Sequence, residues 1–279
     1  MRVLFAPSLN PMKAVVTYAV LASAVFSLAI GPPGFAADLG TPPSRAAMQP
    51  AIAPVVPGWV FSTNFYVWAT GLEGNLRTLP PLPTVHANLS FGDTLGHLDG
   101  ALMGGIEARN DRWVVFTDLV LSKISASENT TVLGLPVSAS FKSTNAIGLL
   151  SGGYRVVDTP QFTLDGLAGV RGFEMNNRIG ISAGPLSGAY EKGAGWVDGV
   201  VGAKARLNLT DQLYATTIGF VGGGSSKYEW DLYGGLGYTF TDHWSAFAGY
   251  RALKVDYQRG NFLYDAMQQG PVMGASYRF

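Results

Sequence analysis

The segment WDLYGGLGYTF (residues 230–240) contains the pattern from which the architecture of the whole chain follows. Every second residue from Trp230 to Phe240 is apolar, aromatic or glycine, and the residues between them include Asp231, Tyr233 and Thr239. Because alternate side chains of a β-strand point to opposite faces, this segment is predicted to be a strand with one uncharged face and one face that carries ionisable groups.

The same alternation recurs in other segments. Between Val197 and Leu209 the charged residues occupy one parity and the aliphatic residues the other, and segment 162–171 follows the same rule. Beyond Trp59 no apolar run is long enough for a transmembrane helix. The chain is therefore predicted to be all-β.

A soluble β-sandwich also alternates, and composition separates it from a membrane protein. The chain has 36 glycines among 279 residues, and only 14% of its residues are charged. The apolar face of a soluble sheet is a packed core that needs side-chain volume, whereas a surface facing lipid needs only apolarity. So many glycines favour a β-barrel whose outer face contacts lipid and whose inner face carries the charges.

Composition and charge exclude several other classes. A disordered chain would be poor in aromatic residues, but 12% of this chain is aromatic. The absence of cysteine excludes a disulfide framework. With 19 basic and 19 acidic residues the net charge is zero, so no basic excess matches a phosphate backbone and no nucleic-acid partner is expected.

The strand length agrees with a membrane span. Ten steps from Trp230 to Phe240 cover roughly 33 Å, and a tilt of about 40° leaves roughly 25 Å along the membrane normal, which is the height of a barrel's lipid-facing band. Aromatic residues expected to face outward at the rims are Trp59, Phe61, Trp113, Tyr154, Phe162 and Trp244.

The breaks between strands fall into two classes. Short polar turns are predicted at 110–111, 158–160, 210–211 and 241–242, and longer connections at 73–97, 126–139, 175–193, 222–227 and 258–263. This asymmetry is typical of a transmembrane antiparallel up-and-down β-barrel, with the short turns and both termini on the periplasmic side. About ten strands are predicted, with eight or twelve as alternatives, at 58–72, 98–109, 112–125, 140–157, 161–174, 194–209, 212–222, 227–240, 243–257 and 264–279.

The N-terminal part is predicted to lie outside the barrel. Residues 1–37 combine a basic start, an apolar run and a small-residue exit, which indicates a cleaved secretory signal peptide, with an uncleaved anchor as the alternative. Met12 is an alternative initiator to Met1. Residues 38–57 are rich in proline and are expected to form an extended periplasmic leader, so that the barrel occupies 58–279.

The chain resembles small bacterial outer-membrane β-barrels of the OmpA-domain and opacity-protein type. The resemblance rests on the signal peptide, the alternating strands with short turns and long loops, and the terminal Tyr277-Arg278-Phe279. Segments 106–109, 249–251 and 255–257 are similar to those of uncharacterised proteobacterial members. The resemblance implies a location in the outer membrane of a Gram-negative bacterium, lipid as a partner, and Tyr277 and Phe279 as the signal for the barrel-assembly machinery.

Charged residues on the inward parity are the most distinctive candidate site. They are Glu107, Arg109, Asp118, Arg155, Asp165, Arg171, Asp198, Lys204, Arg206, Asp231, Arg251 and Arg278. Buried charges persist only when they pair or stay wet. In a narrow barrel the first expectation is a salt-bridged plug that fixes strand register, and the alternative is a narrow polar conduit with little ion selectivity.

Three sequence features that could indicate a catalytic, metal or phosphate site each lack a required element. His243 and Ser245 resemble the His-x-Ser arrangement of lipid A deacylases, but they are expected at a periplasmic turn, away from the outer leaflet. Asp93 with His97, and His86 nearby, fall short of an omptin-type dyad or a zinc site. Gly222-Gly223-Gly224 is not followed by the lysine that a phosphate-binding loop requires.

The sequence therefore predicts an outer-membrane barrel with a structural or surface-interaction role. An extracellular partner is expected to bind through the loops, and no enzymatic activity, cofactor or metal is expected. The alternatives are a small porin-like channel and a lipid A-modifying enzyme.

Overall fold

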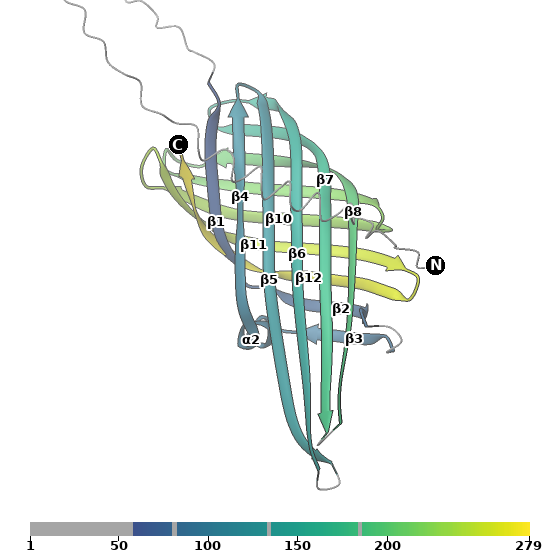
Figure 1. The fold of residues 1–279 in the computed structure, drawn as a ribbon. Helices are drawn as coiled ribbons and strands as arrows, with labels where there is room; N and C mark the ends of the chain where they lie inside the picture. The colour runs from purple at the N-terminus through teal and green to yellow at the C-terminus, as the bar shows by residue number, and fades with distance from the viewer. Residues whose placement is uncertain (1–57, 80–82, 133–134, 184–185) are drawn as a thin grey trace, which may run out of the picture.

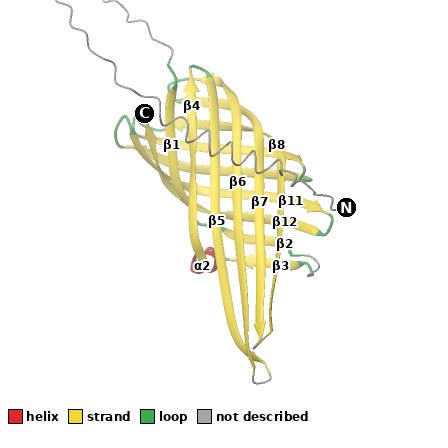
Figure 2. Ribbon diagram, viewed as in Figure 1, coloured by secondary structure: helices red, strands yellow, loops and turns green. Residues whose placement is uncertain are grey.

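The computed structural model describes residues 58–279 except 80–82, 133–134 and 184–185 (Figure 1). These residues form a β-barrel with one short helix (Figure 2). The predicted signal peptide at 1–37 and the leader at 38–57 lie outside the described residues. The described part contains no helix long and apolar enough to cross a membrane.

Ten antiparallel strands form the wall. They are β1 (Val60–Trp68), β4 (Leu98–Asn110), β5 (Trp113–Val132), β6 (Leu135–Asp158), β7 (Phe162–Ala183), β8 (Leu186–Asn208), β9 (Leu213–Gly224), β10 (Tyr228–Thr239), β11 (Trp244–Arg259) and β12 (Phe262–Arg278). Each strand pairs with the next in this order, and β1 also pairs with β12, which closes the ring. The predicted all-β, ten-stranded antiparallel barrel is thereby confirmed.

The first predicted strand is divided in two. The chain leaves β1 at Ala69 and resumes as β2 (Gly71–Arg77), so β1 and β2 pair in turn with the same edge of β12. The break brings the carbonyl oxygen of Ala69 against the backbone of Gly270, where a Cβ atom would overlap it. The prediction of one strand at 58–72 was wrong. The break depends on the close approach of Ala69 to Gly270, which only glycine permits, and Gly270 lies far along the chain.

The connection predicted at 73–97 contains further structure. β2 pairs with β3 (Val85–Leu89), and the short helix α2 (Phe91–Gly96) leads into β4. From Leu98 to Met103, β4 pairs only with β5 among the described residues. Likewise, β3 pairs only with β2. The ring is therefore complete at the end with the short turns, and it is interrupted between β3 and β4 at the other end.

The connections predicted at 222–227 and 258–263 are short turns, 225–227 and 260–261. Two other predicted loops are strands instead. β5–β6 and β7–β8 are long hairpins, with Ser127 opposite Ser140 and Ile181 opposite Gly188, where connections were expected at 126–139 and 175–193. We call the projecting part of these four strands the β5–β8 extension; it comprises 125–132, 135–142, 178–183 and 186–191 (Figure 1). The prediction failed because residues such as Asn129, Pro136 and Gly188 are typical of turns, yet here they lie within paired strands.

The outer surface of the barrel is apolar. Aliphatic side chains that project outward and remain exposed occur on every part of the ring: Val67, Leu102, Val115, Leu150, Val170, Val201, Val221, Leu232, Leu236 and Met273. At the end with the short turns, exposed aromatic residues form contacts with one another, as in the pairs Trp113–Tyr154 and Trp244–Tyr277. Most charged side chains of the wall strands are directed into the lumen, whereas Lys254 of β11 and Asp265 of β12 pair on the outward parity toward the end with the long hairpins.

Candidate functional site

The lumen is the site where most of the chemically active side chains meet. From the end with the short turns toward the long hairpins it contains a polar cavity, a buried layer of ion pairs and a cluster of aromatic and aliphatic residues. Each layer draws side chains from several strands, because every strand directs one parity inward.

The walls of the cavity carry a continuous ionic network. Arg109 on β4 donates to Glu107 at 2.9 Å and to Asp165 on β7 at 2.6 Å. Lys204 on β8 also pairs with Glu107, and Arg155 on β6 donates to Asp165 at 3.0 Å. Four strands are thus joined by charge-assisted hydrogen bonds, which fixes their register as well as their charge.

A second network crosses the lumen above the cavity. Arg251 on β11 donates to Asp231 at 2.8 Å and lies 2.9 Å from Asp118 on β5. Arg171 on β7 donates to Asp231 at 2.7 Å, and the hydroxyl of Tyr66 on β1 donates to Asp118 at 2.7 Å. Arg171 is fully buried, so this layer excludes water from the centre of the barrel.

Glu229 completes this layer. Its carboxylate lies 3.6 Å from Arg171, and its side chain is buried. Asp198 is buried nearby and accepts a hydrogen bond of 2.7 Å from the backbone N–H of Ser226. Arginine suits such a layer because its planar fork can bond two carboxylates at once.

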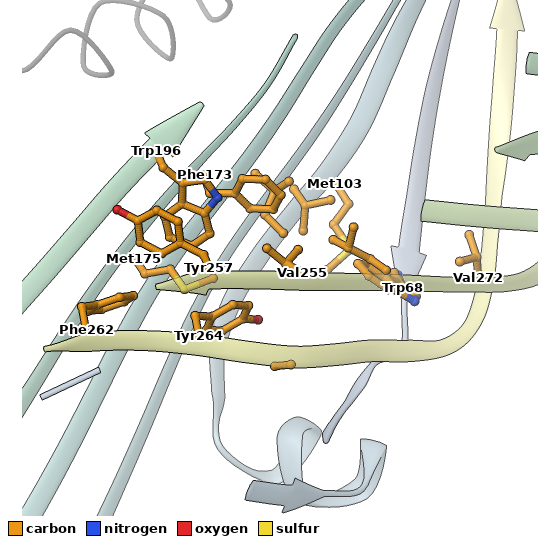
Figure 3. Close-up of a cluster of buried hydrophobic side chains, with 14 residues drawn as sticks. Trp68, Met103, Phe173, Met175, Trp196, Val255, Tyr257, Phe262, Tyr264 and Val272 are labelled. Atoms are coloured by element: carbon orange, nitrogen blue, oxygen red, sulfur yellow. The ribbon is translucent and has the colours of Figure 1, made fainter. Parts of the chain in front are cut away.

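The third layer is apolar. The indole of Trp196 stacks between Tyr257, at 4.0 Å between ring centroids, and Phe173, at 4.8 Å (Figure 3). Phe262 and Tyr264 pack beside them. The other buried members of the cluster, contributed by β1, β4, β5, β6, β7, β11 and β12, are Trp68, Met103, Val120, Ile147, Met175, Leu253, Val255, Ala266 and Val272.

The aromatic cluster closes the lumen. Its side chains come from two facing walls, and most of them are almost fully buried. Arg251 lies over the ring of Trp68 at 4.9 Å, which links the cluster directly to the ionic layer below it. A hydrated ion passing along the barrel axis would have to displace both layers and shed its water, at a high cost in free energy.

The predicted lumen residues fall into two groups. Nine of them make ion pairs: Glu107, Arg109, Asp118, Arg155, Asp165, Arg171, Lys204, Asp231 and Arg251. The other three do not do so among the described residues. Asp198 is held by Ser226, Arg206 stacks on Tyr214 at 3.6 Å, and Arg278 lines the cavity.

Several lumen residues were not predicted from the sequence. Glu229 shares the parity of Asp231, so its position was available from the alternation. Four aromatic residues also lie on inward parities: Tyr66, Phe173, Trp196 and Tyr257. From the sequence alone, an aromatic residue on a barrel strand is equally compatible with an outward position at the rim. Only the pairing of the strands shows which aromatic residues meet inside.

The candidate catalytic residues are held by the backbone. His243 Nδ1 lies 2.8 Å from the carbonyl oxygen of Arg278, and the ring stacks on Tyr277. His97 Nδ1 lies 2.8 Å from the carbonyl oxygen of Asp93, and His86 lies 3.2 Å from Asn75. Over the described residues no group of three or more metal-ligating side chains is found.

Asp93 itself belongs to a capping box at the start of α2. Its carboxylate accepts hydrogen bonds from the N–H and the hydroxyl of Ser90, at 2.9 and 2.7 Å. These bonds lower the pKa of Asp93 below its ordinary value. The residue thus stabilises the first turn of a helix and is not free to act as the acid of a catalytic dyad.

No protein-family model matches the chain, and no curated protein is significantly similar to it in sequence. Among solved structures, it is similar to the translocator domain of the autotransporter NalP from Neisseria meningitidis, with 12% identity over 96% of this chain and 97% of that one and a TM-score of 0.42. It is also similar to Ail, the attachment invasion locus protein of Yersinia pestis, with 13% identity over 80% of this chain and 100% of that one and a TM-score of 0.29. Likenesses of this size bear on neither function nor family.

Proposed function

We propose that this chain is an outer-membrane β-barrel of a Gram-negative bacterium, sealed along its axis, which acts as a surface-interaction protein through its extracellular strands. The observation that carries the proposal is the inversion of the barrel: aliphatic side chains outside, ion pairs inside. A protein surrounded by water would gain free energy from the opposite arrangement.

The outward aliphatic side chains support a lipid environment. Val201, Val221 and Met273 each remain about three-fifths exposed, at 58%, 58% and 61%. Isolated exposed apolar residues are ordinary, but a continuous belt around a barrel is far larger than the apolar patch of a typical soluble monomer. The belt is bordered by exposed aromatic residues at one rim, as expected where lipid head groups meet water.

The proposed orientation follows from the turns and the C-terminus. The short turns and the terminal Phe279 lie at one end, which we assign to the periplasm, and the long hairpins lie at the other. Phe279 is 65% exposed, so it is accessible to the barrel-assembly machinery, with Tyr277 packed beside it. Export through the signal peptide at 1–37 is part of the same proposal.

The sealed lumen favours a structural or binding role over conduction. The ionic layer and the aromatic cluster fill the centre of the barrel with directly contacting side chains. A channel would require both layers to move apart, which would leave Arg171 and Asp231 buried without each other. A small pore is therefore the second candidate, supported only by the cavity at one end.

The β5–β8 extension is the proposed interaction surface. Six to eight residues per strand correspond to about 20–25 Å of sheet beyond the barrel proper. From Leu186 to Val197 the outer edge of β8 has no strand partner among the described residues. An unpaired edge of this kind offers backbone donors and acceptors to another chain.

Electrophoresis and bilayer recording test the proposal. The purified protein should need detergent, should migrate faster unboiled than boiled on an SDS gel, and should be cut in the β5–β8 extension by protease added to intact cells. In a planar bilayer it should show no stable unitary conductance. Solubility without detergent and equal migration would refute the membrane assignment, and steady conductance would replace the sealed barrel with the pore.

An enzymatic role stays a minor alternative. If lipid A were deacylated by the wild-type barrel and the His243→Ala variant were inactive, the surface-interaction role would be wrong.

A further inference from the structure

The cavity at the end with the short turns has a volume of about 550 Å³. It lies between the ionic layer and that end of the barrel, where residues of the β10–β11 turn, Thr241 to His243, form part of its lining. The aromatic cluster blocks it from the long hairpins, so it is a pocket and not a passage.

The charges around this cavity do not balance. Six bases and five carboxylates line it. Four of the bases, Arg109, Arg155, Lys204 and Arg251, are paired with the carboxylates of Glu107, Asp165, Asp118 and Asp231. Arg206 and Arg278 line the same cavity, and neither makes an ion pair among the described residues. Two arginines, Arg206 in the wall and Arg278 exposed at the rim, thus line a polar space without an ion pair, and Asp242 of the β10–β11 turn is the remaining carboxylate of the lining.

Arg206 is held in place by uncharged groups. Its guanidinium lies 3.6 Å from the ring centre of Tyr214, and its Nε donates to the side-chain oxygen of Asn208 at 3.0 Å. Both contacts orient the guanidinium without neutralising it, and among the described residues its terminal nitrogens have no hydrogen-bond acceptor. A guanidinium fixed in this way is organised in advance for a ligand with two acceptor oxygens.

Other bases that line the cavity lie close to Arg206. Glu107 attracts the charge of Arg206, whereas Arg278 and Arg155 both lie close enough to repel it. Arg206 lies on β8 and Arg278 on β12, four strands apart in the ten-stranded ring, so the two arginines approach the cavity from nearly opposite walls. Repulsion inside a confined cavity is relieved when an anion binds between the charges.

We propose that this cavity is a binding site for a small oxyanion of the phosphate or sulfate type, with Arg206 and Arg278 as its principal ligands. The anion would accept hydrogen bonds from both guanidinium groups. The site goes beyond the proposed surface role and is independent of it; only its access from the periplasm rests on the proposed orientation.

Titration of the folded barrel with inorganic phosphate tests the site. The protein is refolded in maltoside micelles free of phospholipid, at low ionic strength, and binding is followed by calorimetry and by phosphorus NMR. Wild-type protein should bind saturably with a stoichiometry of one, and sulfate should compete whereas chloride should do so only weakly. Arg206→Gln and Arg278→Gln should each weaken binding by about tenfold or more, and the double variant should abolish it.

Two matched variants separate the site from general charge effects. Lys192→Gln removes an exposed base of β8, next to the β5–β8 extension and away from the cavity, and should leave phosphate binding unchanged. Arg206→Lys keeps the positive charge but loses the planar guanidinium that can bond two oxygens. Its affinity for phosphate should lie between those of the wild type and Arg206→Gln. The unboiled shift on an SDS gel confirms that each variant is folded before it is titrated.

Three results would overturn the proposal. Wild-type protein could show no saturable binding, or the double variant could bind phosphate as tightly as Lys192→Gln does. Binding could also occur only when a phospholipid with an accessible phosphate is added to the micelles, which would place the anion in a lipid head group at the rim and not in the cavity.

Discussion

The two halves of the lumen obey opposite rules. Near the short turns the interior is ionic and the exterior is aliphatic, with Glu107 and Asp165 inside and Val201 outside. Near the long hairpins the interior is aromatic, with Trp196 and Tyr257 in contact, and the walls continue into the polar β5–β8 extension. The same strands therefore enclose ion pairs near the short turns and a hydrophobic core near the long hairpins.

The surrounding solvent explains this contrast. Where lipid surrounds the wall, the outer face must be apolar, and the inner face is the only place for charge. Where water surrounds the wall, burying aromatic rings inside again lowers the free energy. The aromatic cluster begins at the level of the outward aliphatic residues, with Trp68 next to Val67, and continues beyond them to Tyr257. If the barrel lies in a membrane as proposed, it leaves the lipid along this cluster, and substitutions at the two levels should separate the two halves.

The largest effect is expected in the aromatic half. Trp196→Ala removes the ring that stacks on both Phe173 and Tyr257, and it should lower the free energy of unfolding by about 3–5 kcal/mol through loss of burial and a residual cavity. Urea unfolding in phospholipid vesicles measures it. Trp113→Ala, at the exposed rim, is the matched control and should cost clearly less; equal losses would mean that the upper lumen is not a packed core.

An effect of similar size is expected in the ionic layer. Asp231→Ala leaves Arg171 and Arg251 buried without their shared carboxylate, which should cost about 3–5 kcal/mol in the same unfolding assay. Glu191→Ala removes the exposed partner of Arg178 in the β5–β8 extension. That control should cost at most about 1 kcal/mol, because water already screens the pair. A small loss in Asp231→Ala would show that water reaches the layer.

A charge on the outer face distinguishes membrane from water directly. Leu232→Arg on β10 should cost about 2–4 kcal/mol if that position contacts the lipid core. Ile181→Arg makes the same change at an exposed position of the β5–β8 extension and should stay within about 0.5 kcal/mol of wild type. If both substitutions were harmless in vesicles, the boundary between the two halves would not be a membrane surface.

The smallest expected effect concerns the helix beside the barrel opening. Because the folded-state pKa of Asp93 lies below its unfolded value, the capping box stabilises α2 at neutral pH. It loses this contribution as the pH falls below the ordinary aspartate pKa and through the lower folded-state pKa. Carbon chemical shifts of residues 90–97 should therefore move toward coil values in acid. Asp93→Asn should remove the pH dependence, and an unchanged acid transition in that variant would assign the effect to another group.

Much of the barrel could be predicted from the sequence because its strands lie between two environments. The alternation from Trp230 to Phe240 indicates an apolar surrounding on one side and the lumen on the other, and the same pattern along the chain correctly predicted ten wall strands. The β5–β8 extension could not be predicted in this way, because Ser127 and Ser140 pair through backbone groups that carry no sequence signal. The inward charges were predicted from parity, but their pairing was not.

By itself, the sequence determined the class of fold, the strands of the barrel wall, and which side chains face inward, because these follow from a local period of two residues. Tertiary structure alone decided which inward residues meet. The register between strands far apart in the chain brings Arg171 to Asp231 and Trp196 to Tyr257. It places Arg206 and Arg278 beside a cavity, where neither makes an ion pair with a described residue. Parity is a property of one strand, whereas contact across a lumen depends on the closure of all ten.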